Sequence, residues 1–209
     1  MQHIISTNIS QEGYKLTDKP TIKNLEDILK IFSDNDEVKP VLIGGMAVAA
    51  YIHYYTHEKY RNTNDIDFII DKNKKIDAKE IIYRKSSNLS IKERIIFGYD
   101  GIKIEYEYGP SISILFKDEE VPYNEIELKL GKNNIKLYVA KMEYLLVDKI
   151  FTYLNRKEEK DLNDIKVLAY LMKTYGYDRE LLYKIFSEYS KKYKKYASKA
   201  KDIIEEEFL

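Results

Sequence analysis

The feature that most constrains this fold is a pair of glycines, Gly44-Gly45, between a short apolar run and a helical segment. The run at 41–43 has the sequence VLI and is typical of a buried strand. Residues 46–50, MAVAA, favour a helix whose first turn begins at the glycines. Residues 65–71, DIDFIID, form a second apolar run and are predicted to be another strand. A strand, a glycine turn, a helix and a second strand therefore follow one another along the chain.

The rest of the pattern predicts an α+β fold with two parts. Helices are expected at 20–32 and 76–84, where apolar residues recur with helical spacing. Further strands are expected at 95–99, 102–108, 112–116, 125–130 and 135–139. After these strands the apolar spacing is helical, and Asp178 is expected to cap a third helix of that region. We therefore predict a mixed β-sheet flanked by helices over 1–139 and a C-terminal helical region over 140–209.

Two aspartates on the second strand carry the chemical pattern. Side chains alternate between the faces of a strand, so Asp65 and Asp67 point to the same side, a few ångströms apart. Carboxylates held this close repel each other unless a cation lies between them, and an oxygen-rich site in a chain without cysteine suits one or two Mg²⁺ ions. The backbone N–H groups of Gly44 and Gly45, at the start of a helix, are open to an anion. A phosphate site beside a metal site is what phosphoryl transfer requires.

The order and spacing of these elements, with Arg-x-Thr-x-Asp-x-Asp beginning at Arg61, resembles the nucleotidyltransferase superfamily with the polymerase-β-like fold. Further along, the segments around Lys149, Arg156 and 160–164 look like the downstream motifs of AbiEii-type nucleotidyltransferases. That family includes toxins of type IV toxin–antitoxin systems. The resemblance covers residues 38–172. It implies an enzyme that moves a nucleoside monophosphate from an NTP to an acceptor hydroxyl and releases pyrophosphate, with an antitoxin protein as a candidate partner.

The resemblance also implies roles for single residues. The two glycines would hold the NTP phosphates and the two aspartates would bind Mg²⁺. A downstream lysine and two aspartates, Lys149, Asp161 and Asp164, would complete the nucleotide site. Lys149 would also be catalytic, because it would neutralise charge that builds in the transition state. Arg61 and Thr63, in the segment before the metal-binding aspartates, are further nucleotide-binding candidates.

The residues themselves leave alternatives open at several of these positions. Arg61 either bridges its own loop or contacts phosphate. Lys149 lies inside an apolar helical stripe, where it either contacts phosphate or pairs with a core carboxylate. Asp161 and Asp164 either belong to the site or stabilise the start of a helix.

A third carboxylate, which polymerase-β-like enzymes usually take from a later strand, is the least defined part of the predicted site. Glu105 and Glu107 share a face of the strand expected at 102–108, and Glu125 and Glu127 share a face of the strand expected at 125–130. We choose Glu105, in its Ile-Lys-Ile-Glu context, as the candidate catalytic glutamate. The alternative is that these are ordinary surface residues of a sheet.

Other features limit the classes of function. Without cysteine the chain has neither disulfides nor a thiolate zinc site, and the net charge of +0 argues against a protein devoted to coating nucleic acid. His53 and His57 stand four residues apart and could share a zinc ion, although an exposed helix surface is the simpler reading. The chain has no apolar run long enough to span a membrane, and 1–13 lacks the pattern of a signal peptide, so a cytoplasmic protein is expected.

The acceptor is predicted to be RNA, and specifically a tRNA end, from the family resemblance and from a basic segment. Residues 179–201 carry eight lysines and arginines against Glu180 and Glu188, with tyrosines between them. A solvated helix face would look similar. Tyrosines at 54–55 and 106–108 could stack on bases, although most tyrosines are expected in the core and sheet. Two other functions stay open: a non-catalytic module that binds a nucleotide or a partner, and an enzyme that modifies a small antibiotic-like molecule.

Overall fold

The computed structural model describes residues 13–35, 37–86, 94–118 and 120–208. The segment in which a signal peptide was sought lies, up to residue 12, outside the described residues. The chain divides into two compact units, Met1–Val139 and Ala140–Leu209.

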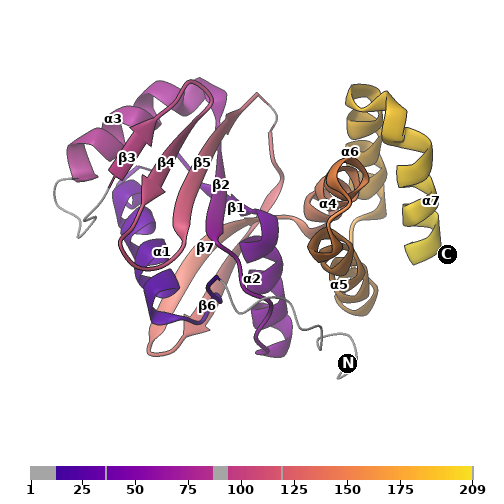
Figure 1. Cartoon of the computed structure of the whole chain (residues 1–209), viewed down its shortest axis with the longest axis horizontal. Helices are drawn as coiled ribbons and strands as arrows, with labels where there is room; N and C mark the ends of the chain where they lie inside the picture. Colours follow the sequence, from indigo (N-terminus) through magenta and orange to yellow (C-terminus); the bar gives the residue numbers. More distant parts are fainter. Residues whose placement is uncertain (1–12, 36, 87–93, 119, 209) are drawn as a thin grey trace. The chain divides into compact units, whose positions relative to one another are not determined.

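The first unit is built on a seven-stranded mixed sheet with the order β3-β4-β5-β2-β1-β7-β6 (Figure 1). The strands are β1 (Val41–Ile43), β2 (Asp65–Asp71), β3 (Arg94–Phe97), β4 (Gly101–Glu105), β5 (Ser111–Lys117), β6 (Tyr123–Leu130) and β7 (Asn133–Ala140). At the centre of the sheet, β2 pairs antiparallel with β1 and parallel with β5. The α+β fold class is confirmed.

Among its described residues this unit has the α-helices α1 (Lys19–Phe32), α2 (Gly44–Thr56) and α3 (Lys75–Lys85), the last preceded by the 3-10 turn η1 (Lys72–Lys74). Alternation of side chains along the central strands separates a buried face of the sheet from a polar one. Ile66 and Phe68 of β2, like Ile112 and Ile114 of β5, are fully buried and form the core. The intervening residues of both strands include aspartates and serines that are half-buried or exposed. One face therefore carries the core and the other is polar where Asp65 and Asp67 lie.

One predicted strand ends earlier than the sequence pattern suggested. The strand expected at 102–108 stops at Glu105, and the next residues leave the sheet. The side chain of Asn24 on α1 donates hydrogen bonds to the carbonyls of Tyr108 (3.4 Å) and Pro110 (3.0 Å). Because the loop is bonded to a helix rather than to a strand, its carbonyls cannot continue the ladder.

The second unit contains the helices α4 (Met142–Arg156), α5 (Glu159–Tyr175), α6 (Arg179–Lys192) and α7 (Ala197–Phe208). Asp178 caps α6, because its side chain accepts a hydrogen bond from the backbone of Leu181 at 3.0 Å, as predicted. The basic segment 179–201 does not form one helix. At Tyr193 the backbone departs from helical geometry, and the Tyr193 ring packs 5.8 Å from that of Phe151. A short 3-10 turn, η3 (Lys194–Tyr196), then leads into α7.

In the described part of the chain, none of the helices combines the length and apolar character that a membrane crossing would need.

Candidate active site

Asp65 and Asp67 lie at the start of β2, on the polar face of the sheet. Asp67 is directly opposite Ile43, the last residue of β1, so the end of β1 and the start of α2 lie beside the two carboxylates. Asp65 is exposed and Asp67 is half-buried. The strand geometry therefore presents both carboxylates to the same side, next to the helix that begins at Gly44.

The close approach of α2 to this strand requires a glycine at position 44. Gly44 has a φ of 69°, in the left-handed region that side chains disfavour. A Cβ atom at this position would lie 2.9 Å from Oδ2 of Asp67. Gly45 has a different constraint, since its Cβ would lie 2.6 Å from Nη2 of Arg61. The glycine pair thus allows Asp67 and Arg61 to pack against the helix start, where any side chain would clash with them.

The loop before β2 also packs against this helix start. Thr63 is nearly buried and exchanges backbone hydrogen bonds with Tyr14, at 2.8 and 2.9 Å. Its hydroxyl donates to the carbonyl of Asp65 at 2.9 Å. The Arg61 guanidinium donates to the carbonyl of Asn62 at 3.2 Å and lies against Gly45. The structure therefore brings Gly44, Gly45, Arg61 and Thr63 together around the start of β2.

This donor set fits Mg²⁺ if the substrate supplies further oxygens. The described residues include no cluster of three or more histidines, cysteines or carboxylates that could hold a metal ion. Mg²⁺ is commonly bound by one or two carboxylates together with substrate phosphates and water. Asp65 and Asp67 provide the two carboxylates, on one side of the strand beside the start of α2.

The strand beside the dyad, β5, carries serines next to the two aspartates. In β5, Ser111 pairs with Asp65 and Ser113 pairs with Asp67. We did not select these serines from the sequence, although the alternation Ser-Ile-Ser-Ile at 111–114 repeats the spacing of the two aspartates. They lie on the polar face because residues paired across neighbouring strands share a face.

Glu105 lies one strand further away, on β4. Lys103 pairs with Ser113, so Lys103 and Glu105 share the face of the two aspartates. Neighbouring strands lie about 4.8 Å apart, which puts the β4 backbone roughly 10 Å from that of β2. Lys103 Nζ donates to Glu105 at 2.8 Å, and this hydrogen bond holds the pKa of Glu105 below its usual range.

The other three glutamates lie in less suitable places. Glu107 is in the loop after β4. Glu125 and Glu127 are on β6, separated from β2 by β1 and β7. Glu125 forms an ion pair with Lys136, whose hydrogen bond lowers the pKa of that carboxyl. Of the three glutamates that lie on strands, Glu105 is the nearest to the dyad by strand order.

The downstream candidates form a buried ion-pair cluster inside the second unit. Lys149 of α4 lies 3.1 Å from Oδ1 of Asp161 and 2.7 Å from Oδ2 of Asp164, both on α5. The two aspartates are 0% exposed and Lys149 is 5% exposed. Asp161 lies in the first turn of α5, but the N-cap position belongs to Glu158. Of the alternatives left open by the sequence, the contacts of Lys149 correspond to pairing with core carboxylates.

Arg156 joins the same cluster and was not among the site residues predicted from the sequence. Its Nε and Nη2 donate to the two oxygens of Asp161 at 2.6 and 2.8 Å. Burial alone would raise the pKa of Asp161, but the Arg156 hydrogen bonds and the Lys149 charge outweigh burial and lower it. Asp161 therefore stays ionised between two cations.

The two histidines do not form a zinc site with other described residues. His53 Nε2 lies 3.1 Å from the carbonyl oxygen of Lys129, and the His53 and His57 rings meet edge to face with centroids 6.0 Å apart. Within the described ranges, they belong to no cluster of three metal-ligand residues.

A family model and solved structures give the relationship of the chain to known proteins. The model for "Nucleotidyl transferase AbiEii toxin, Type IV TA system" matches residues 27–208. The antibiotic-resistance factor ANT(2'')-Ia superimposes with a TM-score of 0.51 at 14% identity, covering 82% of this chain and 94% of the other. A nucleotidyltransferase-like antigen from Paracoccidioides brasiliensis gives 0.50 at 15% identity, covering 90% and 95%. Among curated proteins, none matches the chain. The two structures share the fold of this chain.

Proposed function

The chain belongs to the AbiEii family of nucleotidyl transferase toxins of type IV toxin–antitoxin systems, and from that premise we propose that it transfers a nucleoside monophosphate from an NTP to RNA. The observation that carries this proposal is the close packing of Gly44, at the start of α2, on Asp67 of the polar face of the sheet. It supports a phosphate site at the helix start, beside the carboxylate pair, because the first backbone N–H groups of a helix can bind an anion. An antitoxin protein is the corresponding proposed partner.

The triphosphate is proposed to bind at the start of α2. The backbone N–H groups of Gly44 and Gly45 and the positive end of the helix dipole would hold its phosphates, with Arg61 and Thr63 forming the neighbouring wall. Asp65 and Asp67 would hold Mg²⁺. When bound, Mg²⁺ would neutralise charge on the phosphate oxygens during transfer.

The acceptor hydroxyl would then approach from the opposite side, over β5 and β4. In an in-line displacement the attacking oxygen and the leaving pyrophosphate lie on opposite sides of the α-phosphorus. A new P–O bond forms to the acceptor oxygen, the bond to the β-phosphate breaks, and pyrophosphate leaves toward α2. Glu105, on the acceptor side, is the proposed recipient of the hydroxyl proton.

The buried ion-pair cluster is proposed to have a structural role first. It consists of Lys149, Asp161 and Asp164. Their roles in nucleotide binding come from the family resemblance. Their contacts support a first role in joining α4 to α5, because Lys149 already shares its charge between two buried aspartates. A phosphate contact by Lys149 would have to compete with those two ion pairs.

RNA is proposed as the acceptor because of the basic surface of the second unit. Four exposed lysines, Lys191, Lys192, Lys194 and Lys195, lie at the end of α6 and in η3. Tyr183 and Tyr193 are 42% and 38% exposed and can contact bases. Exposed cations interleaved with aromatic rings suit a phosphate backbone better than a small acceptor. NTP and RNA as substrates are consistent with the cytoplasmic location expected from the sequence.

The acceptor class can be identified with α-labelled NTPs, Mg²⁺ and separate acceptor pools. We expect label on tRNA and none on aminoglycosides. Periodate-oxidised tRNA is the matched control, because periodate cleaves the terminal 2′,3′-diol and leaves the rest of the molecule intact. Loss of labelling after oxidation would place the new bond at the tRNA 3′ end. Label on aminoglycosides alone would replace the RNA proposal with a small-molecule acceptor.

A further inference from the structure

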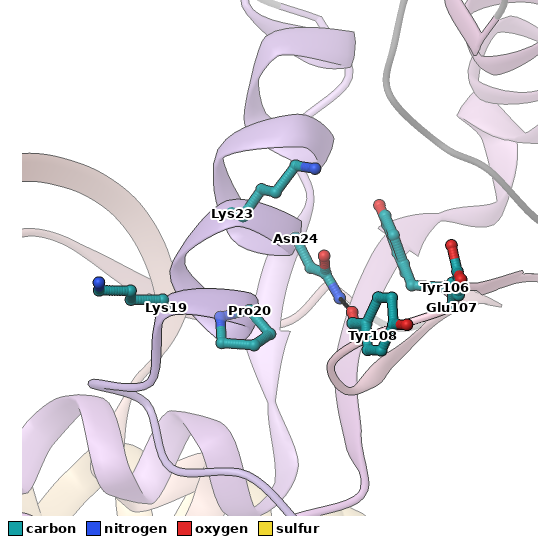
Figure 2. A pocket seen from close by; sticks show the side chains of 7 residues that line it. All are labelled: Lys19, Pro20, Lys23, Asn24, Tyr106, Glu107 and Tyr108. Atoms are coloured by element: carbon teal, nitrogen blue, oxygen red, sulfur yellow. Dashed lines mark hydrogen bonds between the residues drawn. The ribbon is translucent and has the colours of Figure 1, made fainter.

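A pocket of about 320 Å³ lies between the first turns of α1 and the loop that follows β4 (Figure 2). The helix contributes Lys19, Pro20 and Lys23, and the loop contributes Tyr106 and Tyr108. The volume is in the range of small-ligand sites. The nucleotide-binding and metal-binding residues discussed above do not line it.

The wall of this pocket is fixed by contacts between the loop and the helix. Asn24 is buried, and its amide bonds to two loop carbonyls, as Figure 2 shows for that of Tyr108. Gly109 has a φ of 102°, and a Cβ there would lie 2.6 Å from Nδ2 of Asn24. The turn therefore packs directly on α1, and these contacts fix the wall of the pocket.

The lining combines an apolar ring surface with cations and an unused hydroxyl. The Tyr108 side chain is 71% exposed and the Pro20 ring lies on the same pocket. The Tyr106 hydroxyl is buried without a hydrogen-bond partner among the described residues. In Figure 2 Lys23 extends on the side of Tyr106, whereas Lys19 extends away from the tyrosines at the outer rim.

A nucleotide matches these groups. An aromatic base can stack on the exposed Tyr108 ring. A phosphate can bind the Lys23 ammonium. Glu107, which also lines the pocket, leaves a net charge of about +1 with the two lysines. A ligand with one phosphate is therefore better suited than a free triphosphate.

The loop that lines the pocket leads directly into the strand that pairs with the two aspartates. Pro110 is followed by Ser111, whose backbone N–H donates to the carbonyl of Asn64 at 3.2 Å and which pairs with Asp65. The loop thus lies at the end of the sheet where Asp65 begins. It enters β5, the strand over which the acceptor would approach.

We propose that this pocket binds one nucleotide of the RNA acceptor strand, with its base on Tyr108 and its phosphate at Lys23. The inference rests on the proposed transfer to RNA and adds a position for a nucleotide upstream of the acceptor hydroxyl. Free nucleoside monophosphates present the same chemistry, and the experiment must separate the two sources.

Binding of a fluorescent single-stranded oligoribonucleotide, measured by anisotropy without NTP, tests this site. Tyr108→Ala should raise the Kd for RNA roughly 5- to 100-fold, the range for loss of one stacked base. Lys23→Met should raise it about 10-fold. Tyr83→Ala and Lys30→Met, exposed positions on α3 and α1, are the matched controls and should bind as wild type. NTP affinity should not change in any of the four variants.

Crosslinking and transfer assays decide between the remaining outcomes. RNA containing 4-thiouridine should crosslink to the peptide containing residues 106–108. If wild type labels RNA but Tyr108→Ala and Lys23→Met bind RNA normally, this inference is overturned and the proposed function stands. If wild type neither binds nor labels RNA, both fail. If a nucleoside monophosphate fills the pocket and RNA does not displace it, the assignment to the acceptor strand is wrong.

Discussion

Individual residues at the start of α2 set how closely the helix approaches the proposed metal-binding carboxylates. Gly44 combines a left-handed backbone with a 2.9 Å approach of its virtual Cβ to Asp67. These two constraints have different consequences. The left-handed backbone affects folding, whereas the close approach to Asp67 affects the site. A second glycine allows them to be separated. Gly131 has a φ of 66°, and a Cβ there would have no neighbour within 4 Å.

Gly44→Ala and Gly131→Ala should therefore have similar effects on stability and different effects on activity. Both place a side chain in the left-handed region, which costs roughly 1–2 kcal/mol. Only Gly44→Ala displaces Asp67, and displacement of a catalytic group by about 1 Å lowers the rate about 100-fold. Urea denaturation and kcat/KM for NTP transfer measure the two effects. Equal activity of the two variants would show that the close approach at Gly44 is not needed for transfer.

At the scale of elements, the local parts of the site could be predicted and the pairings could not. The strand at 65–71 and the helix after Gly44 follow from apolar spacing and glycine placement, which act over a few residues. Which strand lies beside β2 depends on long-range pairing, so alternation alone could not show that Ser111 and Ser113 adjoin the aspartates. The family resemblance predicts the fold but not which residues of neighbouring strands lie opposite each other.

For Lys149, too, the local part could be predicted from the sequence and the long-range partners could not. Its place in an apolar stripe predicted that it needs an anion, but the partners come from another helix. Only the packing of α4 on α5 shows that two aspartates are those anions. The premature end of β4 has a similar origin, since Asn24, far away in sequence, holds the loop carbonyls.

Lys149→Met is expected to destabilise the protein. Removing the cation leaves two buried aspartates with less compensation, and breaking a buried ion pair costs roughly 3–5 kcal/mol. Lys166→Met, at an exposed position of α5, is the control and should change stability little. Urea denaturation with parallel calorimetry of NTP binding is the measurement. Normal stability with weakened NTP binding would instead identify Lys149 as a phosphate contact.

The Asp161 carboxyl should make stability depend on acid pH. Its pKa is lower in the folded protein than the value of 3.8 for an unperturbed aspartate, so ionised Asp161 stabilises the fold above that pH. This stabilisation is lost as pH falls below the unperturbed value and through the lower folded pKa. The difference in unfolding free energy between wild type and Asp161→Asn should therefore shrink on acidification. A difference that stays constant from pH 7 to pH 3 would contradict this.

Over the whole molecule, charge is balanced in sum but uneven along the chain. Lysine plus arginine and aspartate plus glutamate are each 35, yet 179–201 is strongly basic. The basic positions are spread over α6, η3 and the start of α7 rather than one helix. Neutral net charge therefore coexists with a local cationic surface, which is what a protein that binds RNA at one place requires.

Replacing the four lysines Lys191, Lys192, Lys194 and Lys195 with methionine should flatten the salt dependence of RNA binding. For single strands, each lost phosphate contact reduces the slope of log K against log salt by about 0.7. NTP affinity should be unchanged. A control with the same loss of charge replaces exposed lysines of the first unit, namely Lys30, Lys59, Lys129 and Lys132. If both quadruple variants change the slope equally, the effect is one of total charge and no RNA surface lies on α6 and η3.

The most direct test of the central claim is transfer of label from NTP by wild type and by variants of the β2 aspartates. With Mg²⁺ and tRNA, α-labelled NTP should label the RNA, and γ-labelled NTP should release labelled pyrophosphate. Asp65→Asn and Asp67→Asn should each reduce transfer about 100-fold or more, without loss of thermal stability, because a repulsion is relieved. Asp71→Asn, on the same strand and face, should transfer as wild type. Transfer that is equal in wild type and both dyad variants would contradict the assignment of the active site.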